Sequence, residues 1–137
     1  MNKDKKIGFT CSCFDLLHAG HILMLEDAKK QCDYLIVGLQ TDPTIDRPDS
    51  KNKPIQSLEE RKIQLEAIKY VDEIIVYETE KDLYNLLNEI MPHLRILGSD
   101  YKNKEFTGSD LDIEIYYHNR SHNYSTTNIR KKILNYL

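Results

Sequence analysis

The stretch Thr10-Cys-Ser-Cys-Phe-Asp-Leu-Leu-His-Ala-Gly-His21 decides the fold of this chain, because it joins two segments of different periodicity. A short apolar run typical of a β-strand precedes it at 7–11, and a helical pattern follows it directly. The stretch therefore occupies the turn between a first strand and a first helix. Open α/β sheets bind their ligands at turns of this kind.

Two histidines three residues apart, His18 and His21, end this stretch. In a first helical turn they would share a face beside the free backbone N–H groups of the helix start. Gly20 between them would let a ligand approach the backbone closely. Such a site suits a polyphosphate that gains charge in a transition state. Surface histidines at this spacing are also common, so the pair alone leaves a chance pairing open.

Length and composition indicate one globular domain spanning residues 1–137, with 40% hydrophobic and 30% charged residues. The net charge of −3 gives no support to a nucleic-acid partner, so local groups must hold any phosphate. No apolar run approaches the roughly 20 residues that a membrane span needs. We expect a cytoplasmic protein with no membrane partner.

The three cysteines, Cys11, Cys13 and Cys32, are read first as small thiols in a reducing compartment. Cys11 and Cys13 fall two apart on a predicted strand and should face the same way. A metal site is the weaker alternative, because no second Cys/His pair stands at zinc spacing.

The remaining chain alternates strands and helices. Strands are predicted at 5–11, 34–39, 73–77, 94–97 and 113–117, and later helices at 57–70, 81–91 and 125–137. The near-continuous apolar run at 34–39 indicates a strand covered on both faces. Strand, helix and strand in this order form parallel βαβ units. We predict a single Rossmann-like, doubly wound α/β domain of about five parallel strands, with its site at their carboxyl edge.

Two internal segments have both a structural and a functional interpretation. The polar loop at 40–56 is either a solvated connection or a flap whose Lys51 and Lys53 reach phosphates. Arg61 lies on the apolar stripe of the next predicted helix, where it either extends its charged end to solvent or makes a directed contact; a structural ion pair, with Asp72 as a candidate, is the simpler interpretation. Asp100, after the fourth strand, could accept from a hydroxyl or help to hold Mg²⁺ through water.

A second constellation stands near the end of the chain, where Arg120 precedes Ser125, Thr126 and Thr127. Ser125 can cap the last helix, and a hydroxyl-rich helix start beside an arginine can bind terminal phosphates. A simple N-cap beside a surface arginine is the alternative. His122 could also reach a phosphate.

The segment Cys13-Phe-Asp-Leu-Leu-His-Ala-Gly-His21 resembles the signature of the His-x-Gly-His nucleotidyltransferase superfamily. Within it the chain is most similar to the small cytidylyltransferases, above all glycerol-3-phosphate cytidylyltransferase. The similarity covers nearly the whole chain. It departs where that family has Gly-Thr before Phe14, Gly-Asp-Asp-Trp at 98–101, and a glycine at Asn123 within the Arg-Thr-Glu-Gly-Ile-Ser-Thr-Thr segment.

The resemblance implies transfer of a cytidylyl group from CTP to a small phosphorylated alcohol, glycerol phosphate first, with release of pyrophosphate. An ATP-dependent adenylyltransferase of the same superfamily, whose acceptors include pantetheine phosphate, heptose phosphate and FMN, is the alternative. A non-catalytic nucleotide-binding regulator is another. Mg²⁺ would arrive with the nucleotide, no residue is assigned as a metal ligand, and relatives of this size commonly form homodimers.

The resemblance also implies roles for individual residues. The expected catalytic residues are His18, His21 and Arg120; the expected nucleotide contacts add Cys13, Phe14, Lys53, Ser125, Thr126 and Thr127; the expected acceptor contacts are Asp15, Lys51 and Asp100. Catalysis would then be positioning and charge stabilisation, because a phosphate is already a nucleophile and pyrophosphate already a leaving group.

Overall fold

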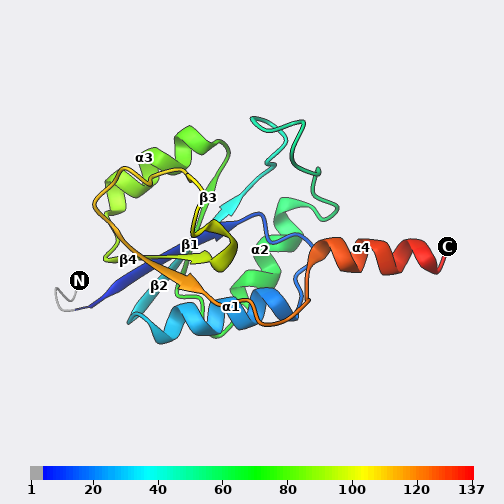
Figure 1. Cartoon of the computed structure of the whole chain (residues 1–137), viewed down its shortest axis with the longest axis horizontal. Helices are drawn as coiled ribbons and strands as arrows, with labels where there is room; N and C mark the ends of the chain where they lie inside the picture. The colour runs from blue at the N-terminus through cyan, green and yellow to red at the C-terminus, as the bar shows by residue number, and fades with distance from the viewer. Residues whose placement is uncertain (1–4) are drawn as a thin grey trace.

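The apolar run at the centre of the chain forms strand β2 (Tyr34–Gln40), which is buried on both faces, as its sequence predicts. The computed structural model describes residues 5–137 (Figure 1). Over that range the elements are β1 (Ile7–Ser12), α1 (Ala19–Lys30), β2, α2 (Leu58–Glu66), β3 (Glu73–Tyr77), α3 (Glu80–Ile90), β4 (Leu94–Gly98), the 3₁₀ turn η1 (Ser99–Tyr101), β5 (Glu114–His118) and α4 (Thr126–Asn135).

The five strands form one parallel sheet in the order β3-β2-β1-β4-β5. Strand order reverses between β1 and β4, so the connections from these two strands leave toward opposite edges and open a crevice at their carboxyl ends. The predicted class, a Rossmann-like α/β domain with parallel strands, is confirmed. The turn after β1 and the turn after β4 both face this crevice.

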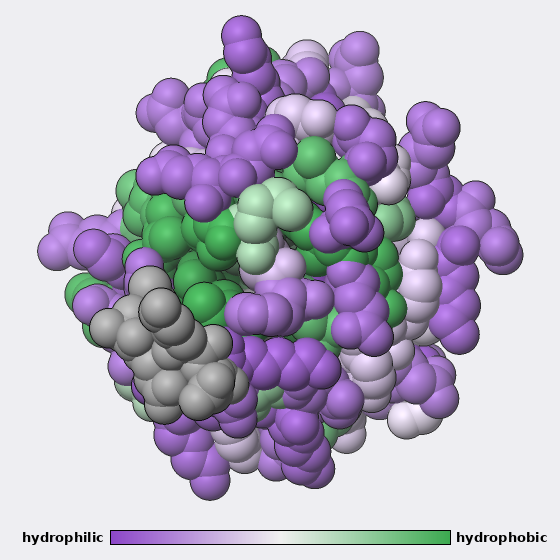
Figure 2. Space-filling model, turned by 90° about the vertical axis from the view of Figure 1, so that its left-hand side faces the viewer, coloured by the Kyte–Doolittle hydropathy of each residue, from purple (hydrophilic) through white to green (hydrophobic). Residues whose placement is uncertain are grey.

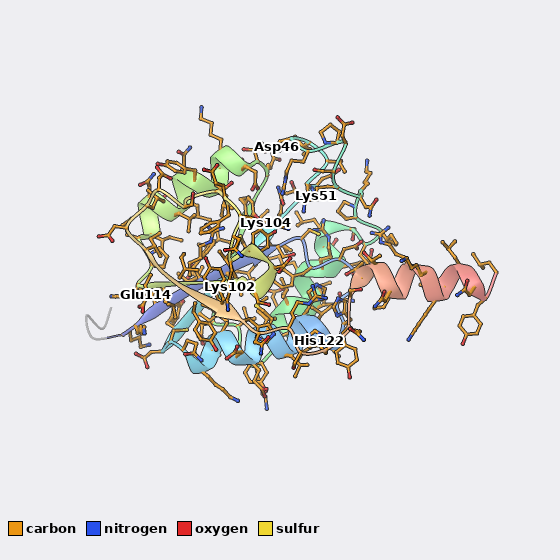
Figure 3. The ribbon with its side chains drawn as sticks, in the orientation of Figure 1. Asp46, Lys51, Lys102, Lys104, Glu114 and His122 are labelled. Atoms are coloured by element: carbon orange, nitrogen blue, oxygen red, sulfur yellow. The ribbon has the colours of Figure 1, made fainter. Side chains whose placement is uncertain are left out.

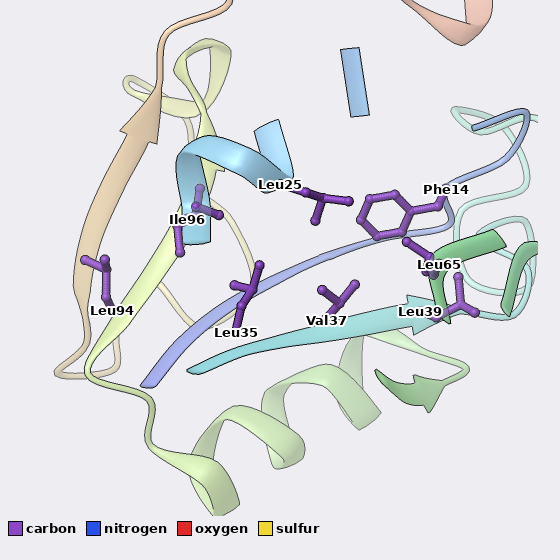
Figure 4. Packing of buried hydrophobic residues seen from close by; sticks show 9 residues of the cluster. Phe14, Leu25, Leu35, Val37, Leu39, Leu65, Leu94 and Ile96 are labelled. Atoms are coloured by element: carbon purple, nitrogen blue, oxygen red, sulfur yellow. The ribbon is translucent and has the colours of Figure 1, made fainter. Parts of the chain in front are cut away.

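Two apolar cores cover the two faces of the sheet. Helices α1 and α2 bring Leu25, Ala28 and Leu65 onto one face. Figure 4 shows Leu25 and Leu65 there with buried residues of β2 and β4. Helix α3 brings Leu83 and Leu87 onto the other face. Burying each large aliphatic side chain contributes about 1.5–3 kcal/mol, so the helices are held mainly by these contacts.

Helix α2 begins as its sequence predicts but ends earlier. The Ser57 hydroxyl accepts a hydrogen bond from the N–H of Glu60 at 3.1 Å, and the Glu60 carboxylate accepts from the N–H of Ser57 at 3.0 Å. The predicted end near Tyr70 is wrong, because Ala67 already closes the helix. From there the chain continues in short turns toward β3, although Ile68 and Tyr70 still pack on the core.

Helix α4 projects away from the body of the molecule, and it has no buried residue (Figure 1). Figure 2 shows the other end, at the amino ends of the strands, where apolar surface is surrounded by polar side chains. Within residues 5–137, every helix is too short or too polar to cross a membrane.

Candidate nucleotide site

The two motif histidines meet at the start of helix α1. His18 is the N-cap residue, not a residue of the first turn as predicted, and its Nδ1 accepts from the N–H of Gly20 at 3.0 Å. His21 Nδ1 accepts from the N–H of His18 at 3.2 Å. The two imidazole centroids are 3.9 Å apart. The spacing of three residues therefore brings the rings together, through a reciprocal cap that uses histidines where Ser and Glu are usual.

These backbone contacts set the tautomer of each ring. A neutral imidazole that accepts at Nδ1 carries its hydrogen on Nε2. His18 and His21 therefore each present an Nε2–H donor to a ligand. The arrangement favours an anion without placing a fixed positive charge on either ring.

Burial keeps both rings neutral. Desolvation, the neighbouring His18 and Arg120 lower the pKa of His21 to about 3, against a smaller opposite effect of Asp15. Desolvation, Arg120 and His122 also lower the pKa of His18. At neutral pH the two rings act as uncharged donors.

The low pKa of His21 predicts acid lability. The unfolded chain, with a histidine pKa near 6.5, binds more protons than the folded one between about pH 6.5 and 3. Stability should therefore be complete above that range and fall by up to about 1.4 kcal/mol per pH unit as the pH drops through it. Urea unfolding of the wild type and of His21→Asn over this range measures the difference. Equal slopes in the two proteins would contradict the assignment.

The carboxyl-terminal constellation lies directly on this helix start. A side chain at Gly20 would meet the carbonyl oxygen of Tyr124 at 3.0 Å and His18 Cε1 at 2.8 Å. The glycine is thus needed for the approach of the chain's own loop, and it also lines the cavity described below. Arg120 donates to the same Tyr124 carbonyl at 3.0 Å, and the Thr126 hydroxyl donates to the carbonyl of Asp15 at 3.1 Å. Segments more than 100 residues apart therefore form one site.

A cavity of about 270 Å³ opens where the two motifs meet. Its lining includes the N–H donors and hydroxyls that sequence analysis singled out, namely His18, His21, Arg120, Ser125 and Thr126. Asp100 and His122 also line this cavity, and Figure 3 shows His122 in the loop that precedes α4. Ser125 also caps α4, whose first N–H groups add to the donor set.

The turn between β1 and α1 is held in a strained form. Phe14 and Leu16 have positive φ angles, 49° and 51°, which branched or bulky residues rarely adopt. Arg61, only 2% exposed, donates to the carbonyl oxygens of Cys13 at 2.9 Å, Gln40 at 2.7 Å and Thr41 at 2.6 Å. The ion pair with Asp72 that sequence analysis considered does not form, because Asp72 pairs with Lys29.

A second, larger cavity of about 620 Å³ adjoins the first at the carboxyl ends of β1 and β4. The two share four lining residues, Ser12, Met24, Gly98 and Tyr101. Three cations line the larger cavity, Arg47, Lys51 and Arg95, together with the polar groups of Gln40, Glu80 and Thr107. The site therefore consists of two adjoining cavities. Cations line the larger one, and the motif histidines line the smaller one.

The two arginines of the larger cavity have unused donors. Arg95 is 3% exposed, donates to the Thr107 carbonyl and lies 5.1 Å from the Phe106 ring centroid, yet its buried Nε has no hydrogen-bond partner among residues 5–137. Arg47 donates to Gln40 at 3.2 Å and to Glu80 at 3.5 Å, and its buried Nε likewise lacks a partner in the described part of the chain. Buried polar groups normally have hydrogen-bond partners. The Nε atoms of Arg47 and Arg95 are therefore available to donate to acceptor atoms of a ligand.

The other residues that sequence analysis predicted for the site lie outside the smaller cavity. Cys13 and Lys51 line the larger cavity, whereas the exposed Lys53 and Thr127 line neither. Phe14 is a core residue, 1% exposed, whose ring centroid lies 5.3 Å from that of His21. The Asp15 carboxylate is engaged within the protein, by the N–H groups of Ile55 and Gln56 and by Arg130.

Sequence reasoning missed the contribution of Arg47 and Arg95 to the larger cavity. An arginine inside the apolar run Leu94–Gly98 was an available signal, because charged residues are almost never fully buried unless paired. It also missed the pairing of His118 with Asp27. No spacing rule connects these two residues, which stand 91 positions apart.

Metal coordination by the protein alone has little support in this site. Within the described part of the chain, no three His, Cys, Asp or Glu side chains gather in a way that could hold a metal ion. Asp100 does line the nucleotide cavity, and one carboxylate with phosphate oxygens and water is a common Mg²⁺ environment. The residues therefore fit a Mg²⁺ that arrives with a nucleotide.

The parallel sheet and its double site, with neutral histidine donors at a helix start, define an α/β domain suited to binding phosphate groups at the carboxyl ends of its strands. A family model described as cytidylyltransferase-like matches residues 9–132. The chain belongs to this cytidylyltransferase-like family.

Individual relatives refine this picture. The bifunctional protein HldE of Campylobacter concisus is 38% identical over 129 residues, which cover 94% of this chain and 27% of that protein. HldE of Helicobacter pylori is 39% identical over 129 residues, covering 94% and 28%. The chain thus spans little more than a quarter of these relatives. They carry the name HldE, and not that of the glycerol-3-phosphate cytidylyltransferase expected from the motif.

Solved structures share the fold. A lipopolysaccharide core biosynthesis protein from Thermoplasma volcanium superimposes with a TM-score of 0.67 at 27% identity, covering 88% of this chain and 99% of that one. A pantoate-β-alanine ligase from Francisella tularensis gives a TM-score of 0.68 at 22% identity, covering 95% and 67%. The second likeness shows the fold alone.

Proposed function

We propose that this chain transfers the adenylyl group of ATP to a phosphorylated sugar and releases pyrophosphate. The observation that carries the proposal is the pair of adjoining cavities at the carboxyl ends of β1 and β4. One offers neutral N–H donors, a guanidinium and a helix start, which suit a triphosphate. The other offers arginines and hydroxyl-binding groups, which suit a second phosphate carried on a polyol.

The choice of a sugar phosphate and ATP over glycerol phosphate and CTP has support from two kinds of relative. The curated relatives are HldE proteins, and the solved relative at 27% identity acts in the biosynthesis of a lipopolysaccharide core, which is built of sugars. Among the acceptors that the superfamily resemblance leaves open, heptose phosphate agrees best with both. A volume of about 620 Å³ also accommodates a hexose or heptose phosphate.

The proposed reaction is an in-line displacement at the α-phosphorus. A phosphate oxygen of the acceptor forms a bond to that phosphorus, and the bond from the α-phosphorus to the bridging oxygen of pyrophosphate breaks. His18 and His21 donate to the α-phosphate as its charge develops, while Arg120, Ser125 and Thr126 hold the outer phosphates. Mg²⁺ bound with ATP would neutralise further phosphate charge, with Asp100 as its protein contact.

In the proposed reaction, the larger cavity binds the acceptor. Arg47, Arg95 and Lys51 would bind the acceptor phosphate, and Glu80, Gln40 and Thr107 would bind sugar hydroxyls. A regulator that only binds nucleotide would need the smaller cavity alone. The buried Nε atoms of Arg47 and Arg95, which no group of residues 5–137 satisfies, therefore favour an enzyme over a regulator.

A substrate panel tests the function. Purified full chain is offered ATP or CTP with sugar 1-phosphates, glycerol 3-phosphate or pantetheine phosphate, and pyrophosphate release and the nucleotide-linked product are measured. We expect the fastest release with ATP and a sugar phosphate. Turnover only with CTP and glycerol phosphate would overturn the donor and acceptor assignment, and no turnover with any pair would overturn the enzyme.

Arg47→Met tests, in the same assay, whether the larger cavity binds the acceptor. The Arg47 side chain is about one-third exposed, so its loss should leave the fold intact. We expect the KM for the sugar phosphate to rise about tenfold, the scale of one charged hydrogen bond, with the KM for ATP unchanged. A rise in the KM for ATP alone would mean that ATP binds in the larger cavity and the sugar phosphate in the smaller one.

A further inference from the structure

A carboxylate–histidine pair lies behind the smaller cavity. His118, the last residue of β5, is 8% exposed, and its Nδ1 is 2.7 Å from an oxygen of Asp27 on α1. The Asp27 carboxylate also accepts from the Tyr116 hydroxyl, at 3.0 and 3.1 Å, and from the Gln31 amide at 3.2 Å. Because so many donors surround the carboxylate, it fixes the His118 ring in one orientation.

The other nitrogen of His118, Nε2, also bears on the function of the smaller cavity. Its Nε2 is buried and unpaired within the described residues, while the residue lines the smaller cavity. A buried, unsatisfied ring nitrogen at the wall of a binding site needs an explanation. Since Nδ1 faces a carboxylate, it carries a hydrogen, so Nε2 is a bare lone pair when the ring is neutral. It becomes an N–H donor only when the ring gains a proton.

The other histidines of this cavity are fixed differently. Nδ1 of His18, of His21 and of His122 each accepts from a backbone N–H, so each neutral ring already has its hydrogen on Nε2. Protonating any of these rings would turn an accepted hydrogen bond into a clash of two N–H groups. Within this set, His118 alone has a carboxylate partner that can offset a positive charge.

We propose that His118, positioned by Asp27, is a further nucleotide-binding residue, which takes up a proton from solvent and donates an N–H to a phosphate oxygen when a triphosphate fills the smaller cavity. The step forms one N–H bond and breaks no bond of the nucleotide. The inference rests on the proposed function, because it needs a nucleotide in that cavity.

The groups around His118 explain why the proton arrives with the ligand. The Asp27 carboxylate on α1 contacts the ring and can offset its positive charge. Titratable or charged groups that line the same cavity are His18 and His21 at the start of α1, Arg120, His122 and Tyr124 in the loop, and Asp100 and Tyr101 in η1, while Tyr116 on β5 shares the Asp27 carboxylate. A triphosphate adds several negative charges to this set and tips the balance toward the imidazolium.

Calorimetry measures this proton directly. ATP with Mg²⁺ is titrated into the full chain in buffers of different ionisation enthalpy, at a pH about one unit above the ordinary histidine pKa of about 6.5. We expect an uptake approaching one proton per ATP in the wild type. His118→Asn keeps a donor to Asp27 but has no atom at the Nε2 position, so it should lose this uptake and bind ATP about tenfold more weakly.

Two further variants separate the proton effect from a structural one. Asp27→Asn removes the carboxylate and should lower the proton uptake even if His118→Asn does not fold. His93→Asn changes an exposed histidine at the opposite end of β4, whose Nδ1 accepts from Ile7, and should keep both uptake and affinity. In the wild type, the Kd for ATP should rise up to about tenfold per pH unit where His118 is neutral in the free protein.

The outcomes are distinguishable. Tight ATP binding without proton uptake, or equal uptake in the wild type and His118→Asn, overturns the role of His118 and leaves the proposed function standing. If the wild type binds neither ATP nor CTP, the proposed function falls and this inference falls with it.

Discussion

Replacing His21 by asparagine should lower kcat by about 10²–10³-fold and leave the fold in place. The asparagine carboxamide oxygen can accept from the N–H of His18 as Nδ1 does, so the helix cap survives. The Nε2–H donor is lost, and in the proposed reaction that donor would contact the phosphate whose charge grows in the transition state. Loss of one such donor typically costs about 10²–10³-fold in rate. Steady-state kinetics with ATP and the sugar phosphate measures it.

His21→Gln is the matched control for this prediction. Its amide nitrogen can reach the position of Nε2, whereas its contact with the N–H of His18 is lost. We expect glutamine to recover much of the rate that asparagine loses, at some cost in stability. Equal kcat values for the two variants, or a change confined to KM, would mean that His21 acts only as a helix cap or in uniform binding.

Replacing Arg61 by methionine should destabilise the protein by about 3 kcal/mol or more. The guanidinium joins three carbonyl oxygens from the turn after β1 and from the end of β2, and a methionine would leave buried acceptors unsatisfied. Each such group costs about 1–3 kcal/mol. Urea unfolding gives the change in free energy, and the midpoint should fall with little change in slope.

Lys62→Met serves as the comparison, because the neighbouring Lys62 is exposed on the same helix. Surface changes of this kind usually stay within about 0.5 kcal/mol. Because Arg61 binds the carbonyl of Cys13, its loss should also relax the strained turn at Phe14 and lower activity in the molecules that remain folded. A variant as stable as Lys62→Met would show that water satisfies these carbonyls.

The fold was predictable because its signals are local. The buried strand β2, the capping box at Ser57 and the apolar stripe of α3 each depend on residues a few positions apart, and parallel order follows from strand–helix alternation. The end of α2 was missed because the turns beyond Ala67 carry apolar residues that still pack on the core. Periodicity reports burial and is less sensitive to where a helix stops.

The candidate site also has features that the sequence could predict and features that it could not. The placement of His18, His21 and Arg120 around one cavity could be predicted, since both motifs follow strands whose carboxyl ends share an edge. Asp15 could not be assigned from its motif, because its partners, Arg130 and the backbone of Ile55 and Gln56, lie 40 or more positions away. The larger cavity was missed for a similar reason, because its two arginines come from segments far apart in the sequence, a loop and a later strand.

By itself, the amino-acid sequence determined the class of the fold, its parallel order and the position of a candidate phosphate site at the first helix, because periodicity, caps and turn residues act over short range. The tertiary structure alone decided which polar atoms are left without partners. It set the tautomers of the four histidines, joined Asp27 to His118 and gave Arg47 and Arg95 a common cavity. These properties depend on burial and on contacts between distant segments, which exist only after the chain has packed.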